Sequence, residues 1–217
     1  MENLTLVQQI TIMVIPLIFA ITVHEVAHGW VANQFGDPTA KMMGRLTLNP
    51  IKHIDPIGTL LVPGILFYLG GFIFGWAKPV PITWQNLKNP RRDMALVALA
   101  GPTANLIMAI LWGFIMKISL LLPPNLETLQ MVLILMAKAG IMLNVVLMVL
   151  NLIPIPPLDG SRILSSLVSP RASNFLHQIE PYGFIILVIL LTTGVLAKIM
   201  TPIIYLAIYW IKLLLNL

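Results

Sequence analysis

Residues 5–32 read TLVQQITIMVIPLIFAITVHEVAHGWVA, an apolar run with two histidines and a glutamate near its end. About twenty apolar residues suffice for a helix to cross a bilayer core, so this stretch predicts a membrane-spanning helix. The preceding residues, Met1 to Leu4, contain neither a basic region nor a small-residue cleavage site. We therefore expect a permanent span rather than a removable signal.

The composition of the whole chain agrees with a lipid environment. Hydrophobic residues make up 58% of the 217 residues and charged residues 10%, whereas about a quarter of the residues in soluble domains are charged. Further apolar runs cover about 57–76, 94–122, 129–150, 181–197 and 199–215, with Lys198 and Pro202 at the last division. We predict an all-α polytopic membrane protein, a helical bundle of about five spans that forms one integral-membrane domain over residues 1–217.

The run at 57–76 differs from the others because it is rich in residues that break helices, namely Gly58, Pro63, Gly64, Gly70, Gly71 and Gly75. The stretch from Trp76 to Ile82 follows, and its closely spaced prolines exclude a helix. One interpretation is an irregular span followed by a loop. We favour a re-entrant hairpin with extended chain, because non-helical backbone is tolerated at membrane depth where protein or water covers it.

The motif His24-Glu25-Val26-Ala27-His28 is the strongest functional signal. Residues four apart share one face of a helix, so both imidazoles can reach one metal ion while Glu25 lies beside it. Polar residues that only pack against other helices are a weaker explanation, since ionisable groups inside a membrane are costly and usually functional. The motif predicts one Zn²⁺ per chain, bound by His24 and His28, with Glu25 as the catalytic acid and base.

A catalytic zinc usually has three protein ligands and an open position for water. The best candidate for the third is Asp159, in the stretch NLIPIPPLDG at 151–160. Its three prolines stop the helix where the run 129–150 leaves the membrane, and Gly160 would allow a turn that other residues resist. Asp37 and Asp55 remain alternative ligands, and a solvated Asp159 in a proline-rich loop remains an alternative to a metal site.

The combination of these motifs resembles the site-2 protease family of intramembrane zinc metalloproteases, in its compact prokaryotic branch. The similarity covers most of the chain and extends to GDPTA at 36–40, GRLTLNP at 44–50 and AGPTAN at 100–105. The resemblance implies that His24, His28 and Asp159 bind zinc and that Glu25 activates a water molecule.

The same resemblance suggests that Asn105 makes a polar contact to the substrate. A hydrogen bond between helices explains Asn105 equally well, because membrane helices use asparagine in this way. Asn151, the other candidate for substrate binding, has the same two interpretations, as does Asn144. For His53, a hydrogen bond to backbone is a better expectation than a contact with the metal.

The position of the motifs also predicts the topology. His24 and Asp159 can meet if the runs 5–32 and 129–150 end on the same side, which requires the run 57–76 to be re-entrant. In that arrangement one side collects the basic residues, and basic residues mark the cytoplasmic side; they are Lys41, Arg45, Lys52, Lys78, Lys88, Arg91, Arg92, Arg162 and Arg171. We predict a protein of the prokaryotic cell membrane with its active site toward the cytoplasm.

The predicted function is hydrolysis of peptide bonds in transmembrane substrates, within or near the membrane, as in regulated intramembrane proteolysis. The extended stretch 76–82 is suited to receive an unwound substrate as an added strand. The expected partners are a transmembrane protein or peptide and the lipid bilayer. Nucleic acid is not expected, because the net charge of +5 comes from scattered basic residues without a basic stripe.

Two other functions fit parts of the sequence. A divalent-metal transporter could use the same ligands, but such proteins tend to show repeated halves and further carboxylates along a path, and neither is visible. A catalytically silent membrane scaffold would have no need for Glu25 beside the two histidines. The sequence therefore favours the protease.

Overall fold

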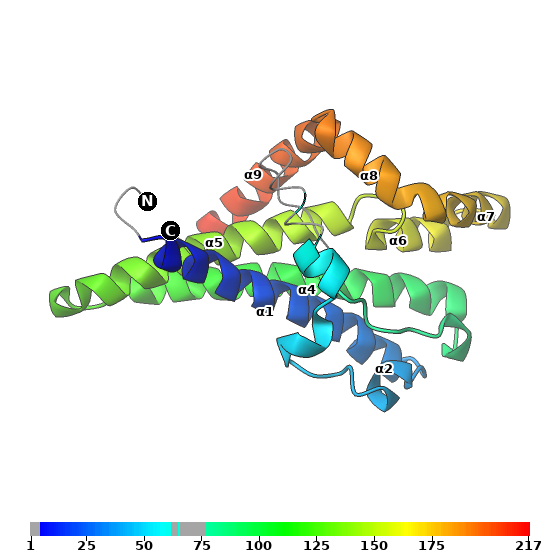
Figure 1. The fold of residues 1–217 in the computed structure, drawn as a ribbon, viewed down its shortest axis with the longest axis horizontal. Coiled ribbons are helices and arrows are strands. Elements are labelled where there is room, and N and C mark those ends of the chain that lie inside the picture. Colours follow the sequence, from blue (N-terminus) through cyan, green and yellow to red (C-terminus); the bar gives the residue numbers. More distant parts are fainter. Residues whose placement is uncertain (1–4, 62–64, 66–76) are drawn as a thin grey trace.

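The computed structural model describes residues 5–61, 65 and 77–217, and Figure 1 shows the fold. The longest helices are α1 (Leu6–Gln34), α4 (Pro90–Ser119), α5 (Glu127–Asn151) and α9 (Val195–Leu215). Shorter helices are α2 (Thr39–Met42), α6 (Asp159–Leu167), α7 (Pro170–Ile179) and α8 (Gly183–Thr192), with further single turns at Pro50–His53, Pro56–Leu61, Trp84–Asn86, Pro124–Leu126 and Glu180–Tyr182. The described residues contain no strand, which confirms the all-α prediction.

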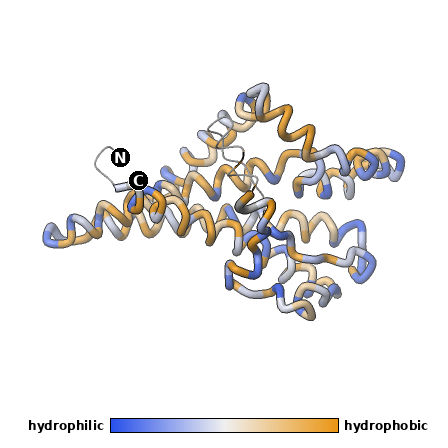
Figure 2. The backbone as a smooth tube through the Cα atoms, viewed as in Figure 1, coloured by the Kyte–Doolittle hydropathy of each residue, from blue (hydrophilic) through white to orange (hydrophobic). Residues whose placement is uncertain are grey.

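Within the described part of the chain, five segments are long and apolar enough to cross a membrane, in agreement with the prediction of about five spans: Val7–Gln34, Pro90–Ser119, Pro124–Asn151, Pro170–Thr192 and Val195–Leu215. Buried residues form between 11% and 39% of the most apolar window of each segment. Most of this apolar surface is therefore left for lipid to cover. Figure 2 shows hydrophobic residues along the helices and hydrophilic residues gathered at helix ends and in loops.

Helices α1, α4 and α5 form the centre of the bundle and lie side by side (Figure 1). Hydrogen bonds between α1 and α4 join His28 to Val97 and Asn105 to Ala20, so these two helices are antiparallel. Bonds from Asn105 to Asn144 and from Gln130 to Ser119 show that α4 and α5 are antiparallel as well. Helices α1 and α5 therefore run in the same direction and end at the same end of the bundle.

Helix α9 packs against α4 and α5 and completes the hydrophobic core. The core residues are Ala109 and Trp112 of α4, Ala137, Ile141, Val145 and Val149 of α5, and Leu196, Met200, Ile211 and Leu215 of α9. At Gly140 a Cβ atom would lie 2.4 Å from the Trp112 ring, so the absence of a side chain is what lets the indole approach α5. The bond from Lys117 Nζ to the carbonyl of Leu215 (2.8 Å) holds the end of α9 beside the end of α4.

The loop that follows α1 is organised by the buried carboxylate of Asp37. It accepts hydrogen bonds from Thr39, from the N–H of Thr83 (2.7 Å) and from Asn86 Nδ2 (3.0 Å). Burial alone would raise the pKa of Asp37, but these bonds lower it below its usual value. Asp37 thus ties the segment 77–88 to the end of α1.

The predicted hairpin at 57–76 lies mostly outside the described residues, and so does Trp76. Residues 77–83 contain no helix, as their prolines predict. The N–H of Lys78 donates to the carbonyl of His53 (2.9 Å), and Arg45 donates to the carbonyl of Lys78 (2.9 Å). His53, before the run 57–76, and Lys78, after it, therefore lie at the same end of the bundle, the C-terminal end of α1.

The division between the last two apolar runs was predicted at the wrong place. Helix α9 continues through Lys198 and Pro202, and the chain breaks instead at Gly194, which has a φ of +74°. This left-handed conformation favours glycine. Pro202 lies inside α9 and removes one intrahelical hydrogen bond without ending the helix, as membrane helices tolerate.

Candidate metal centre

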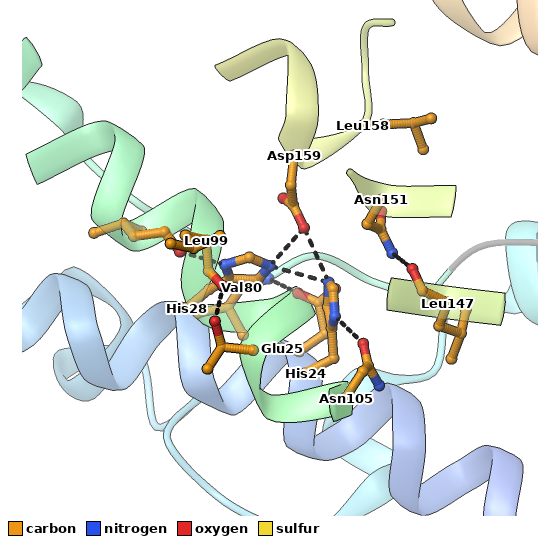
Figure 3. Close-up of polar contacts among 12 residues, drawn as sticks. His24, Glu25, His28, Val80, Leu99, Asn105, Leu147, Asn151, Leu158 and Asp159 are labelled. Atoms are coloured by element: carbon orange, nitrogen blue, oxygen red, sulfur yellow. Dashed lines mark hydrogen bonds and ion pairs between the residues drawn. The ribbon is translucent and has the colours of Figure 1, made fainter. Parts of the chain in front are cut away.

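The structure brings His24, His28 and Asp159 together (Figure 3). The histidines lie four residues apart on α1, so both imidazoles project from one face of the helix. Asp159 is the first residue of α6. Its Oδ2 atom lies 3.3 Å from Nε2 of each histidine, and the two Nε2 atoms are 3.0 Å apart.

The outer nitrogens of the two rings determine which atoms face this centre. Nδ1 of His24 lies 2.6 Å from Oδ1 of Asn105, and Nδ1 of His28 lies 2.7 Å from the carbonyl oxygen of Val97. Both partners are oxygen acceptors, so each Nδ1 carries the single proton of a neutral imidazole. The two Nε2 atoms therefore present lone pairs to one another and to Asp159, an arrangement that calls for a cation among them.

The donor set fits a zinc ion. Ligand atoms about 2.0–2.1 Å from a tetrahedral zinc lie about 3.3 Å from each other, which matches the separations of 3.0 and 3.3 Å found here. Oδ2 of Asp159 is buried and has no hydrogen-bond partner in the described chain. Buried carboxylate oxygens are rarely left without a partner, so this atom also fits a metal ligand.

Gly101 of α4 lies directly against the two imidazole rings. A Cβ atom at this position would lie 2.4 Å from Nε2 of His28 and 2.5 Å from Cε1 of His24. Any side chain here would push the rings out of place. Gly101 thus leaves the room in which the two histidines converge.

The proline-rich stretch after α5 explains how Asp159 reaches the centre. Helix α5 ends at Asn151, and α6 begins at Asp159 and packs against α4. Gly160 was predicted to allow a turn that other residues resist, and the reason for this is not a left-handed backbone, since its φ does not lie in that region. Its Cβ would instead lie 2.4 Å from the carbonyl oxygen of Leu152, so glycine is needed for the close approach of two backbone segments.

Glu25 lies next to this centre, on the same helix as the two histidines (Figure 3). Its Oε2 atom accepts a hydrogen bond from the N–H of Val80 (2.8 Å). Gly29, one turn further along α1, makes this approach possible, because a Cβ there would lie 2.8 Å from the Val80 side chain. The extended segment therefore runs directly beside the predicted catalytic carboxylate.

The two asparagines proposed for substrate binding have other partners. Asn105 is fully buried, and both ends of its amide are bonded, to His24 on one side and to Ala20 and Asn144 on the other. These contacts match the alternative of a bond between helices. Nδ2 of Asn151 donates to the carbonyl of Leu147 (3.0 Å), within α5 (Figure 3).

The alternative metal ligands are engaged elsewhere. The carboxylate of Asp37 accepts hydrogen bonds within the loop after α1, including one from the N–H of Thr39. Oδ1 of Asp55 accepts bonds from the N–H groups of Ile57 and Gly58. His53 is buried and bonds the carbonyl of Thr47 (2.9 Å), as expected of a loop histidine. Among the described residues, neither aspartate belongs to the group formed by His24, His28 and Asp159.

Comparison with known proteins places these residues in a family. The sequence model of Peptidase family M50 matches residues 12–124 and 118–194. The protein named "Putative zinc metalloprotease YwhC" from Bacillus subtilis is 43% identical over 88% of this chain and 84% of its own length. "Putative zinc metalloprotease Rip2" from Mycolicibacterium smegmatis is 34% identical over 83% of this chain, which spans 66% of that relative. No solved structure matches.

The family match covers well over half of the chain, and it includes the histidine motif of α1 and the Leu-Asp-Gly sequence at the start of α6. The relatives agree with it in their names and in the extent of their similarity. The chain is therefore a member of Peptidase family M50, the site-2 protease family of zinc metalloproteases.

Proposed function

We propose that this protein hydrolyses peptide bonds of membrane-spanning substrates within or near the bilayer, using one zinc ion bound by His24, His28 and Asp159. Family membership makes it a zinc metalloendopeptidase, and its apolar helices make it an integral membrane protein. The observation that carries the assignment of ligands is the convergence of two lone-pair nitrogens and one unpaired carboxylate oxygen within 3.3 Å.

The zinc ion supplies the site with a coordinated water of lowered pKa and with a Lewis acid that polarises the scissile carbonyl. We assign to Glu25 the transfer of the water proton to the leaving amine. The N–H of Val80 holds Oε2 of Glu25 and so orients the carboxylate, which leaves Oε1 to accept the proton.

The segment Lys78–Pro81 is our candidate for the substrate-binding edge. This segment has no N–H group left to donate to a substrate. The N–H of Lys78 donates to His53, the N–H of Val80 donates to Glu25, and the two prolines have no N–H group. Arg45 donates to the carbonyls of Lys78 and Pro79 (2.9 and 3.3 Å). The carbonyls of Val80 and Pro81 are therefore the candidates, and because successive carbonyls of an extended chain point to opposite edges, we expect one of the two to pair with an N–H group of an unwound substrate.

A cleavage assay tests the function. Purified protein in lipid vesicles should cleave a membrane-spanning peptide, lose this activity when a chelator removes the metal, and regain it with Zn²⁺ but not with Mg²⁺, which prefers six oxygen ligands. Cleavage by fully metal-free protein would contradict the proposal. Uptake of zinc into the vesicles without cleavage would favour a transporter.

We also propose that the site faces the cytoplasm and that residues 57–76 do not cross the membrane. The support comes from the parallel directions of α1 and α5, and from the contacts of Lys78 with His53 and Arg45 at one end of the bundle. The basic residues named above belong to segments at this same end, and cytoplasmic loops are rich in such residues.

Cysteine labelling checks this topology, and the chain has no cysteine of its own to interfere. Single cysteines at Thr47 and Gln85 should both react with an impermeant reagent from the cytoplasmic face, and a cysteine at Asn125 should react from the opposite face. Labelling of Gln85 and Asn125 from the same face would make residues 57–76 a true span and contradict the proposal.

A further inference from the structure

A chain of hydrogen bonds crosses three helices and ends at His24. Nδ2 of Asn144 on α5 donates to the carbonyl of Gly140 (2.8 Å). Nδ2 of Asn105 on α4 donates to Oδ1 of Asn144 (3.0 Å), and Oδ1 of Asn105 faces Nδ1 of His24 on α1 (2.6 Å). Both asparagines are fully buried. We propose that Asn144 and Asn105 form a positioning relay that fixes the proton and the ring orientation of His24.

The chemistry of each partner determines the direction of this relay. The carbonyl of Gly140 can only accept, so the amide nitrogen of Asn144 must face it and the amide oxygen must face Asn105. The nitrogen of Asn105 must then face Asn144. A second carbonyl, that of Ala20, lies 3.2 Å from the same nitrogen and requires the same orientation.

The oxygen of Asn105 is therefore the atom left for His24, and an amide oxygen can only accept. Nδ1 of His24 must carry the proton, and in a neutral imidazole this leaves a lone pair on Nε2. Nε2 is the atom that faces Asp159 and His28. Neither asparagine needs to touch the metal or the substrate, because the relay acts through the histidine.

The two histidines differ in how they are held. His28 donates to a backbone carbonyl, that of Val97, which side-chain substitution does not remove. The hydrogen bonds that hold His24 come from the side chains of Asn105 and Asn144, so substitution can remove them. The inference rests on the proposed function, since His24 is there a zinc ligand, and it assigns a role to Asn144 and to the buried end of Asn105.

Zinc affinity is the appropriate measurement, because a purely structural role would not depend on the acceptor atom. In the purified full-length protein, competition with a chromophoric chelator should give a dissociation constant about 10–100-fold weaker for Asn105→Leu, a typical loss when the partner of a metal-binding histidine is removed. Asn105→Asp should lose less affinity than Asn105→Leu, because its carboxylate still accepts the Nδ1 proton although it can no longer donate to Ala20 and Asn144. Asn144→Leu should show a smaller loss, since Ala20 still holds the Asn105 amide.

Two variants control for packing. Val145→Ala removes buried volume beside Asn144, and Thr103→Val removes a hydroxyl that bonds within α4. Both should keep the zinc affinity of wild type, and both should keep its visible absorption spectrum with Co²⁺, which Asn105→Leu should change. Folding is checked in every sample by the helical circular dichroism signal.

Equal losses of affinity in Asn105→Leu and Asn105→Asp would overturn the relay, because the acceptor atom would then be irrelevant. Unchanged affinity in Asn105→Leu would overturn it as well, and unchanged affinity in Asn144→Leu would remove Asn144 from it. If the wild-type protein bound no zinc at all, the proposed function itself would fail. The two failures are therefore distinguishable.

Discussion

Replacement of Glu25 by glutamine is expected to slow peptide cleavage by about 10²–10⁴-fold, the usual contribution of a positioned general base. The amide of glutamine cannot take a proton from water. It has nearly the same shape, and its oxygen can still accept the bond from the N–H of Val80. The variant should therefore fold normally and keep its zinc, so that the loss appears in the rate alone.

Metal analysis of the same sample distinguishes a general base from the main alternative, in which Glu25 is itself a zinc ligand. Zinc bound per chain should equal that of wild type in Glu25→Gln and should fall in His24→Ala, which lacks a ligand. A loss of zinc in Glu25→Gln as large as that in His24→Ala would show that Glu25 binds the metal. Wild-type cleavage by the variant would remove Glu25 from the reaction.

Replacement of Asp159 by asparagine is expected to weaken zinc binding by more than about 100-fold. Loss of an outer partner of a zinc ligand already costs about 10–100-fold, and here the anionic ligand itself is replaced by a neutral amide. Oδ2 of Asp159 lies 3.3 Å from both Nε2 atoms, so the new group faces two lone pairs with no negative charge to hold the cation. Chelator competition on the purified variant measures this loss.

Asp55→Asn provides the matched control for this variant. Asp55 is an aspartate in the loop after α1, and asparagine can still accept the bonds from Ile57 and Gly58 through its own oxygen. Its zinc affinity should equal that of wild type. Full metal binding and full cleavage by Asp159→Asn would show that Asp159 is not a zinc ligand and would favour the alternative of a solvated aspartate in a proline-rich loop.

Much of the fold could be predicted from the sequence because lipid imposes strong rules. Apolar runs of about twenty residues that lack helix-breaking residues are predicted as helices, since no water is present in the bilayer core to satisfy exposed backbone groups. The exact end of a run is harder to predict. The chain breaks at Gly194 and not at Lys198 or Pro202, because the left-handed backbone of Gly194 ends a helix, while α9 continues through Pro202 with the loss of one intrahelical hydrogen bond.

The residues predicted for the metal site are in contact, because a helix fixes the spacing of His24 and His28 and the prolines free Asp159 from α5. The sequence suggested bonds between helices for Asn105 and Asn144 but did not reveal that these bonds lead to His24. The bond from His28 to the carbonyl of Val97 could not be predicted, because every residue has a backbone carbonyl. Gly101 could have been suspected from its place before Pro102 and Asn105, but its role depends on how closely α4 approaches α1.

X-ray absorption at the zinc edge of the purified protein tests the central claim most directly, because it reports the atoms around the metal without relying on activity. The account predicts four light ligands, two of them histidine nitrogens at about 2.0–2.1 Å, with oxygen from Asp159 and water completing the shell. His28→Ala should reduce the imidazole contribution by half. A shell of six oxygens, or an imidazole signal that keeps its full wild-type strength in His24→Ala and His28→Ala alike, would contradict the claim that these residues hold the catalytic zinc.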